Sequence, residues 1–151
     1  MVDQNYQLGG ALAPAASLNI QNDIAASQGG SIRVIGPLGA VGYGTGAGGS
    51  VTQATNKSTG VTLNAPCGKI TMNAASLANA TAVGFTFTNS VIAATDTVVV
   101  SIGAGGTVNS YTCTVDTVAA GSCHVSLYNF TGGSLAEAVV INFAVIKAVI
   151  L

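Results

Sequence analysis

Short runs in which apolar and polar residues alternate recur through most of the chain, and they constrain its fold more than any other feature. In one such run Val83, Phe85 and Phe87 share one side, and Gly84 and Thr86 share the other. An alternation of period two places successive side chains on opposite faces of a β-strand. Turn-forming residues separate the runs, and Val, Thr, Ile and Phe dominate them. The pattern predicts an all-β body, either an antiparallel β-sandwich or a jelly-roll-like fold.

The most apolar run extends from Val139 to Leu151 and is apolar on both faces. A strand of this kind is expected in the centre of a sheet or under another subunit, because at a free edge it would promote aggregation. The continuous run from Thr97 to Ile102 likewise predicts a strand covered on both faces, and residues 134–138 predict one helical turn. The side chains expected in the core or at a subunit interface are Phe85, Phe87, Ile141, Phe143 and Val145.

The sequence before the body divides into two parts. Residues 1–41 have no periodic apolar pattern apart from a short strand expected near 31–35, and they predict an extended N-terminal arm. A frayed terminus is the alternative interpretation. Residues 42–50 are rich in glycine and predict a hinge, followed by the β-sandwich body at 51–151. The arm residues expected to lie on a partner surface are Tyr6, Leu8, Leu12, Leu18, Ile20 and Ile24.

Charged residues make up only 6 % of the chain, whereas hydrophobic residues make up 49 %. Soluble domains usually carry about 25 % charged residues, so the deficit favours a subunit whose surface is largely covered by partners. The apolar stretch 135–151 contains Glu137, Asn142 and Lys147, and it is too short for a comfortable membrane span of about 20 residues. The first five residues lack the pattern of a secretory signal. Four scattered basic residues form no basic face, so we expect neither a membrane nor a nucleic acid as partner.

Reactive side chains are few and scattered. We interpret the three cysteines, Cys67, Cys113 and Cys123, as small buried hydrophobic side chains. The turn at 119–121 leaves open a pairing of Cys113 with Cys123 across a hairpin. His124 lacks further metal ligands at suitable spacing. It also forms no nucleophilic pair with Cys123, because neighbours in a strand point to opposite faces. Asp96 is expected to form a turn by accepting a hydrogen bond through its side chain. We therefore expect no catalytic residue, no cofactor and no metal, and hence no enzyme.

Several blocks of the sequence resemble a widespread β-domain of the virion structural proteins of tailed bacteriophages. The blocks lie in order between Gly42 and Ala148 and leave residues 1–35 uncovered. They are Gly49–Thr55, Ser58–Asn64, Gly68–Thr71, Phe85–Ser90, Ala93–Asp96, Val118–Ser122 and Asn142–Lys147.

The resemblance implies a non-enzymatic virion component, most similar to a small head decoration (cement) protein. Proteins of this class are often homotrimers that are made in the host cytoplasm and lie on the capsid exterior. The implied partners are therefore the major capsid protein, whose neighbouring subunits would be bridged, and further copies of the chain itself. The alternative implied by the same resemblance is a tail-fibre, tail-tip or adsorption module. A secreted carbohydrate-binding module is a third interpretation, but 5 % aromatic residues and no Trp count against it.

Overall fold

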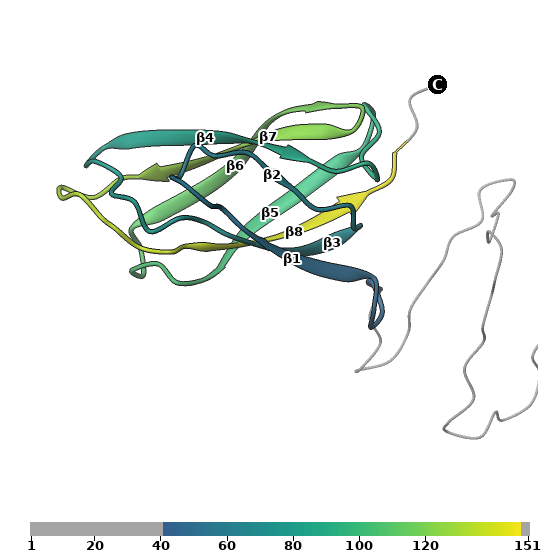
Figure 1. Ribbon diagram of the computed structural model, residues 1–151, viewed down its shortest axis with the longest axis horizontal. Coiled ribbons are helices and arrows are strands. Elements are labelled where there is room, and N and C mark those ends of the chain that lie inside the picture. Colours follow the sequence, from purple (N-terminus) through teal and green to yellow (C-terminus); the bar gives the residue numbers. More distant parts are fainter. Residues whose placement is uncertain (1–40, 149–151) are drawn as a thin grey trace, which may run out of the picture. The chain divides into compact units, whose positions relative to one another are not determined.

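The computed structural model describes residues 41–148, which form eight β-strands and no helix (Figure 1). The all-β prediction is confirmed for this part of the chain, and no helix within it could cross a membrane. The expected arm, with its apolar residues from Tyr6 to Ile24 and the strand near 31–35, lies outside the described residues. The strands are β1 Gly48–Thr52, β2 Val61–Thr62, β3 Cys67–Thr71, β4 Thr81–Thr88, β5 Thr97–Ala104, β6 Tyr111–Ala119, β7 Ser122–Asn129 and β8 Val140–Ile146.

The strands form two four-stranded sheets that face each other as a β-sandwich (Figure 1). One sheet has the order β1-β3-β8-β5 and the other the order β2-β4-β7-β6. The expectation of a purely antiparallel body was wrong, because β1 pairs with β3 and β2 pairs with β4 in parallel. The reason is the path of the chain. From β1 to β6 consecutive strands alternate between the two sheets, so strands two apart in sequence can lie side by side and run in the same direction.

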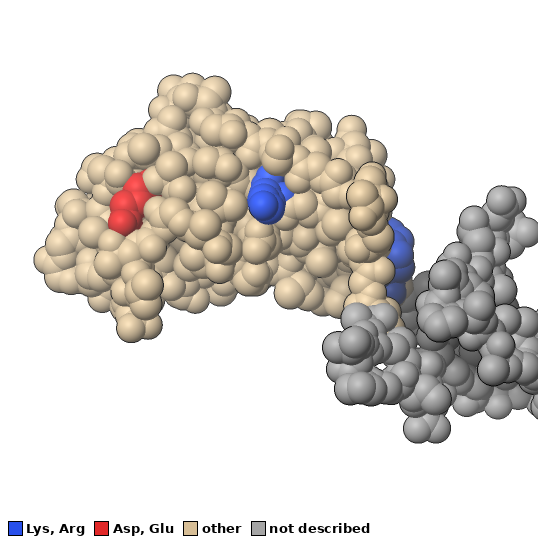
Figure 2. Space-filling view, turned by 90° about the horizontal axis from the view of Figure 1, so that it is seen from below, with Lys and Arg blue, Asp and Glu red and all other residues tan. Residues whose placement is uncertain are grey.

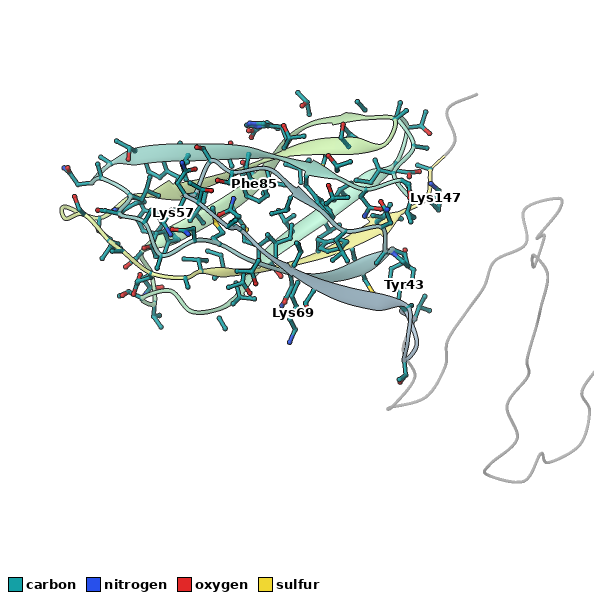
Figure 3. All side chains as sticks on the ribbon, viewed as in Figure 1. Tyr43, Lys57, Lys69, Phe85 and Lys147 are labelled. Atoms are coloured by element: carbon teal, nitrogen blue, oxygen red, sulfur yellow. The ribbon has the colours of Figure 1, made fainter. Side chains whose placement is uncertain are left out.

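The core lies between the two sheets and is built from the inward sides of the alternating strands. All five side chains expected in the core or at an interface lie here: Phe85, Phe87, Ile141, Phe143 and Val145 are at most 4 % exposed. The rings of Phe87 from β4 and Phe143 from β8 meet edge to face, with centroids 4.7 Å apart and an interplanar angle of 63°. This is a favoured aromatic geometry. The pair joins the two sheets, and Figure 3 shows Phe85 within the same interior.

Strand β8 lies between β3 and β5, which confirms its expected central position. Strand β5 differs from expectation, because it is the edge strand of that sheet. Val98 is buried on its inner side, whereas Val99 is 46 % exposed on its outer side. The sandwich covers only the inner face of β5. A continuous apolar run therefore does not by itself show that the same chain covers both faces of the strand.

Residues 134–138 form no helical turn, contrary to expectation. Leu135 instead pairs with Leu77 through two backbone hydrogen bonds of 2.8 and 3.0 Å. This bridge satisfies backbone groups that a helical turn would otherwise have to satisfy internally.

The glycine-rich segment expected as a hinge at 42–50 ends in regular structure, because β1 begins at Gly48. Gly49 faces inward, and a Cβ there would come within 2.8 Å of Leu63. Before β1, the hydroxyl of Tyr43 donates to the backbone carbonyl of Val145. The segment therefore contacts the end of β8 at one end of the sandwich, where Figure 3 labels Tyr43 and Lys147.

Candidate functional site

The outer face of the β1-β3-β8-β5 sheet carries one row of small side chains across all four strands. One row across the four strands consists of Gly48, Cys67, Ala144 and Val99. The next row consists of Ser50, Lys69, Asn142 and Ser101. Nothing larger than valine projects from the first row, so a second surface could approach it closely.

This face carries very little charge. Figure 2, which views the sandwich from the side of this sheet, shows a Lys or Arg patch in the middle, another at one end and an Asp or Glu patch toward the opposite end, with uncharged surface between them. Lys69 projects from β3 away from the interior (Figure 3). Val99 and Ile146 add apolar surface, at 46 % and 54 % exposed. The face has the sparse charge that is typical of the centre of a protein interface.

The outer face of the other sheet carries a polar cluster centred on Asp116. Its carboxylate accepts from the hydroxyl of Thr114 at 3.0 Å and from the hydroxyl of Ser126, and it lies 2.8 Å from Nδ1 of His124. The hydrogen bonds from Ser126 and His124, with a smaller one from Thr114, lower the pKa of the Asp116 carboxyl. All four side chains come from β6 and β7, which form a hairpin with a bulge between Val115 and Thr117.

The cluster contains Ser, His and Asp, but its hydrogen bonds do not match a nucleophile–base pair. The Ser126 hydroxyl donates to the carboxylate instead of facing the imidazole. The His124 ring extends toward Gly84 on β4, where a Cβ would lie 2.7 Å from Nε2. A base must accept the proton of its nucleophile directly. Cys123 is no alternative nucleophile, because it is buried between the sheets while His124 lies outside, as the alternation predicts.

The three cysteines are free thiols. The hairpin that left open a pairing of Cys113 with Cys123 exists, but its register places Cys113 opposite Leu127 and Cys123 opposite Val118. Burial raises the pKa of Cys113, and it raises that of Cys123 to about 11. Both thiols therefore stay protonated near neutral pH, which agrees with the interpretation of the buried Cys123 and the half-buried Cys113 as small hydrophobic side chains.

Polar side chains close the end of the sandwich opposite Tyr43. Lys57 is 3 % exposed, and its ammonium donates to the carbonyls of Asn73 at 2.6 Å and Glu137 at 2.5 Å. Burial lowers the pKa of Lys57, and the nearby Glu137 carboxylate partly offsets this effect. Gln53 donates to the Lys57 and Thr59 carbonyls at 2.9 and 2.8 Å. These contacts tie three loops together, and Figure 3 shows Lys57 at this end.

Ionisable side chains also hold the other end. Asp96 accepts from the backbone N–H of Ala93 at 2.7 Å, which confirms its expected role in a turn. Lys147 donates to the same carboxylate at 2.5 Å and to the Val91 carbonyl at 2.9 Å. The Ala93 hydrogen bond and then the Lys147 contact lower the pKa of Asp96. Within residues 41–148 no three His, Cys, Asp or Glu side chains gather as metal ligands.

Sequence reasoning identified the core but missed the Asp116 cluster. The alternation of His124 with Ser126 and of Thr114 with Asp116 was visible, and it indicates that each pair shares a face. The pairing register that brings the two strands' polar sides together was not visible. The arm residues expected on a partner surface cannot be placed, because they lie outside the described residues.

Comparisons with known proteins find no match to this chain, neither a family model, nor a curated protein, nor a solved structure.

Proposed function

We propose that this chain is a non-enzymatic structural protein of a tailed-phage virion that binds the capsid exterior as a homotrimer and bridges neighbouring major capsid subunits. Two observations support the proposal. The sequence blocks between Gly49 and Lys147 resemble phage virion proteins, and the outer face of the β1-β3-β8-β5 sheet carries a row of small side chains and little charge. The second observation carries the argument, because it concerns how the folded body can associate.

A nearly uncharged face loses little when it leaves water, since the costly step in burying a surface is the desolvation of charges. Its size indicates how strong one contact can be. Four strands about 4.8 Å apart and about six residues long on average cover roughly 19 by 20 Å, or about 380 Å². Stable interfaces bury about 800 Å² per partner. A single contact of this face is therefore weak, and ring closure in a cyclic oligomer, where each copy makes two such contacts, would supply the remaining affinity.

We assign the contact between trimer subunits to this sheet face, and the capsid contact to the arm. In a cyclic trimer the interface is heterologous, so the face of one copy meets a different surface of the next. Lys69 of one copy then need not oppose Lys69 of its neighbour. The side chains Phe85, Phe87, Ile141, Phe143 and Val145 contribute indirectly, because they hold the sheet in shape from within.

Averaged cryo-electron microscopy density of the virion tests the location. Trimers on the head shell are the expected result, and density confined to the tail would refute the decoration role. The role of the sheet face is tested with Val99→Asp, which should abolish the trimer in light-scattering mass measurements. Thr112→Asp on the other sheet is the matched control and should leave the trimer intact. A trimer that tolerates Val99→Asp as well as the control would refute the assignment.

One observation favours the alternative of a tail-fibre, tail-tip or adsorption module. The Tyr43 hydroxyl contacts Val145 near the end of β8, so the described chain enters and leaves at the same end of the sandwich. A body held at one end presents its opposite loops outward, as a tip module requires. The same cryo-electron microscopy density separates the two locations.

A further inference from the structure

The outer side of β7 presents two aromatic rings followed by three polar side chains. Tyr128 is 37 % exposed, and Phe130, which follows the strand directly, is 50 % exposed. The backbone N–H of Phe130 still donates to Ser110 at 3.2 Å, so the chain stays beside the start of β6 there. The alternation along the strand continues the line with Ser126, His124 and Ser122. From Phe130 to Ser122 this line is roughly 27 Å long at about 3.4 Å per residue.

The neighbouring strands flank this line with small residues and hydroxyls. On β4, Ala82 lies opposite Tyr128 and Gly84 lies opposite Ser126, so no bulky side chain stands beside the rings. On β6, Thr112 lies opposite Tyr128. At the far end of the line a depression of about 250 Å³ is lined by Thr86, Thr117, Ala119, Ser122, Cys123 and His124.

Hydrogen-bonding groups along the line are fixed in place. The Asp116 carboxylate holds His124 and Ser126 through the contacts described above. Because these hydrogen bonds lower its pKa, the carboxyl is ionised and remains an acceptor at neutral pH. The Nε2 atom of His124 is turned away from Asp116, toward Gly84. The face thus combines a fixed acceptor, an imidazole and several hydroxyls.

Basic residues are absent from this face among residues 41–148. Lys69 lies on the opposite sheet, Lys57 is buried among the loops, and Lys147 follows β8. A face without cations does not suit phosphate, nucleic acid or an acidic peptide. It also lacks the apolar centre expected of a protein interface, since only one end of the line is aromatic.

We propose that this face binds a neutral glycan. Sugar rings offer C–H faces that pack on the exposed rings of Tyr128 and Phe130, because the face of an aromatic ring is electron-rich. Sugar hydroxyls both donate and accept, and they match the hydroxyls of Ser122 and Ser126 together with the Asp116–His124 pair. The length of the line suits an oligosaccharide better than a single sugar. The low aromatic content of the whole chain does not argue against such a site, because Tyr128 and Phe130 lie two positions apart on the same side of the strand. The proposal does not depend on the virion role, since it concerns the opposite sheet.

Nuclear magnetic resonance titration of the isotope-labelled full chain tests the proposal. The probes are neutral hexasaccharides of α- or β-linked glucose, mannose, galactose and N-acetylglucosamine, with heparin as the anionic comparison. We expect saturable shifts confined to β4, β6 and β7, with a dissociation constant of about 1 mM or tighter for at least one neutral probe. Tyr128→Ala and Phe130→Ala should each weaken binding at least about tenfold, and the matched control Tyr43→Ala should not.

Four outcomes would overturn the glycan proposal. The first is no shift with any neutral probe at about 10 mM, far above the expected dissociation constant. The second is binding that maps to the β1-β3-β8-β5 sheet, and the third is binding that the two aromatic variants leave unchanged. Shifts with heparin alone would also count against it. Because Tyr128 and Phe130 are exposed, thermal unfolding should show that both variants fold normally.

Discussion

Replacing Phe143 by Ala should destabilise the body far more than the same replacement at Phe130. Phe143 is 4 % exposed and meets the ring of Phe87 from the opposite sheet, whereas Phe130 is 50 % exposed. Truncating a buried Phe to Ala costs about 3–5 kcal/mol, because the apolar contact is lost and a cavity is left. The half-exposed ring should cost at most about 1 kcal/mol. The two variants change the same atoms, so their difference reports the packing between the sheets.

Urea unfolding followed by circular dichroism measures this difference, at one protein concentration so that self-association affects all samples equally. With an m-value of about 1.5 kcal/mol/M, a loss of 3 kcal/mol lowers the midpoint by about 2 M. The Phe87→Ala and double variants complete a cycle. The double variant should lose about 0.5–1.5 kcal/mol less than the sum of the single variants, because the two rings interact with each other. If Phe143→Ala costs no more than Phe130→Ala, the ring does not join the two sheets and the packing argument fails.

Three further changes test other parts of the body. Gly68→Ala should cost at least about 2 kcal/mol in urea unfolding, since a Cβ at φ +157° would overlap the Gly49 carbonyl of β1, whereas Gly132→Ala, with open space around it, should cost almost nothing. Asn129→Asp should be strongly destabilising at pH 7 and partly restored near pH 4. In the native chain the Asn129 side-chain amide donates to the carbonyls of Leu77, Ala78 and Gly133. An ionised carboxylate at this position would face these three acceptors without a proton to donate, and protonation would relieve the repulsion. Equal stability of the variant at both pH values would contradict this explanation. The pKa of Lys57 is lowered in the folded state. Between that lowered pKa and the ordinary value of 10.5, the unfolded chain therefore binds more protons than the folded chain. The contribution of Lys57 to folding stability should rise with pH across this window. The stability difference between the native chain and Lys57→Met should therefore grow in favour of the native chain as the pH rises toward 10, and a difference that does not change with pH would show that Lys57 is not desolvated.

The fold could be predicted to the extent that it depends on local patterns. Alternation identified the inward sides of β4 and β8, and the two-sided apolar character of β8 indicated its central position. The parallel pairing of β1 with β3 had no local signal, because it depends on the chain crossing to the other sheet between them. The exposed outer side of β5 was missed for a related reason. Apolar content shows that a surface should be covered, but not whether its own chain covers it.

The Asp116 cluster could be predicted only in part. The sequence places His124 and Ser126 on one side of a strand, and Thr114 and Asp116 on one side of another. Their meeting depends on the register of the β6–β7 hairpin. That register is fixed by a tight turn in which Gly121 has φ +80°, and by the bulge between Val115 and Thr117. A bulge adds a residue to one strand and shifts the partners beyond it, so counting positions back from the turn does not give the partner of Asp116.

Within residues 41–148 most charged side chains bind other groups, either at one of the two ends of the sandwich or on the outer face of the β2-β4-β7-β6 sheet. At the loop-rich end, Lys57 donates to backbone carbonyls and the Glu137 carboxylate accepts from Thr107. At the opposite end, Lys147 donates to the Asp96 carboxylate. The Asp116 carboxylate is bound by three polar side chains. This leaves Lys69 as the charge that projects from an otherwise uncharged sheet face. Surface charges of like sign keep monomers apart. A sheet face with a single free charge has little of this repulsion to oppose association, which makes it the face on which the Val99→Asp variant is most informative.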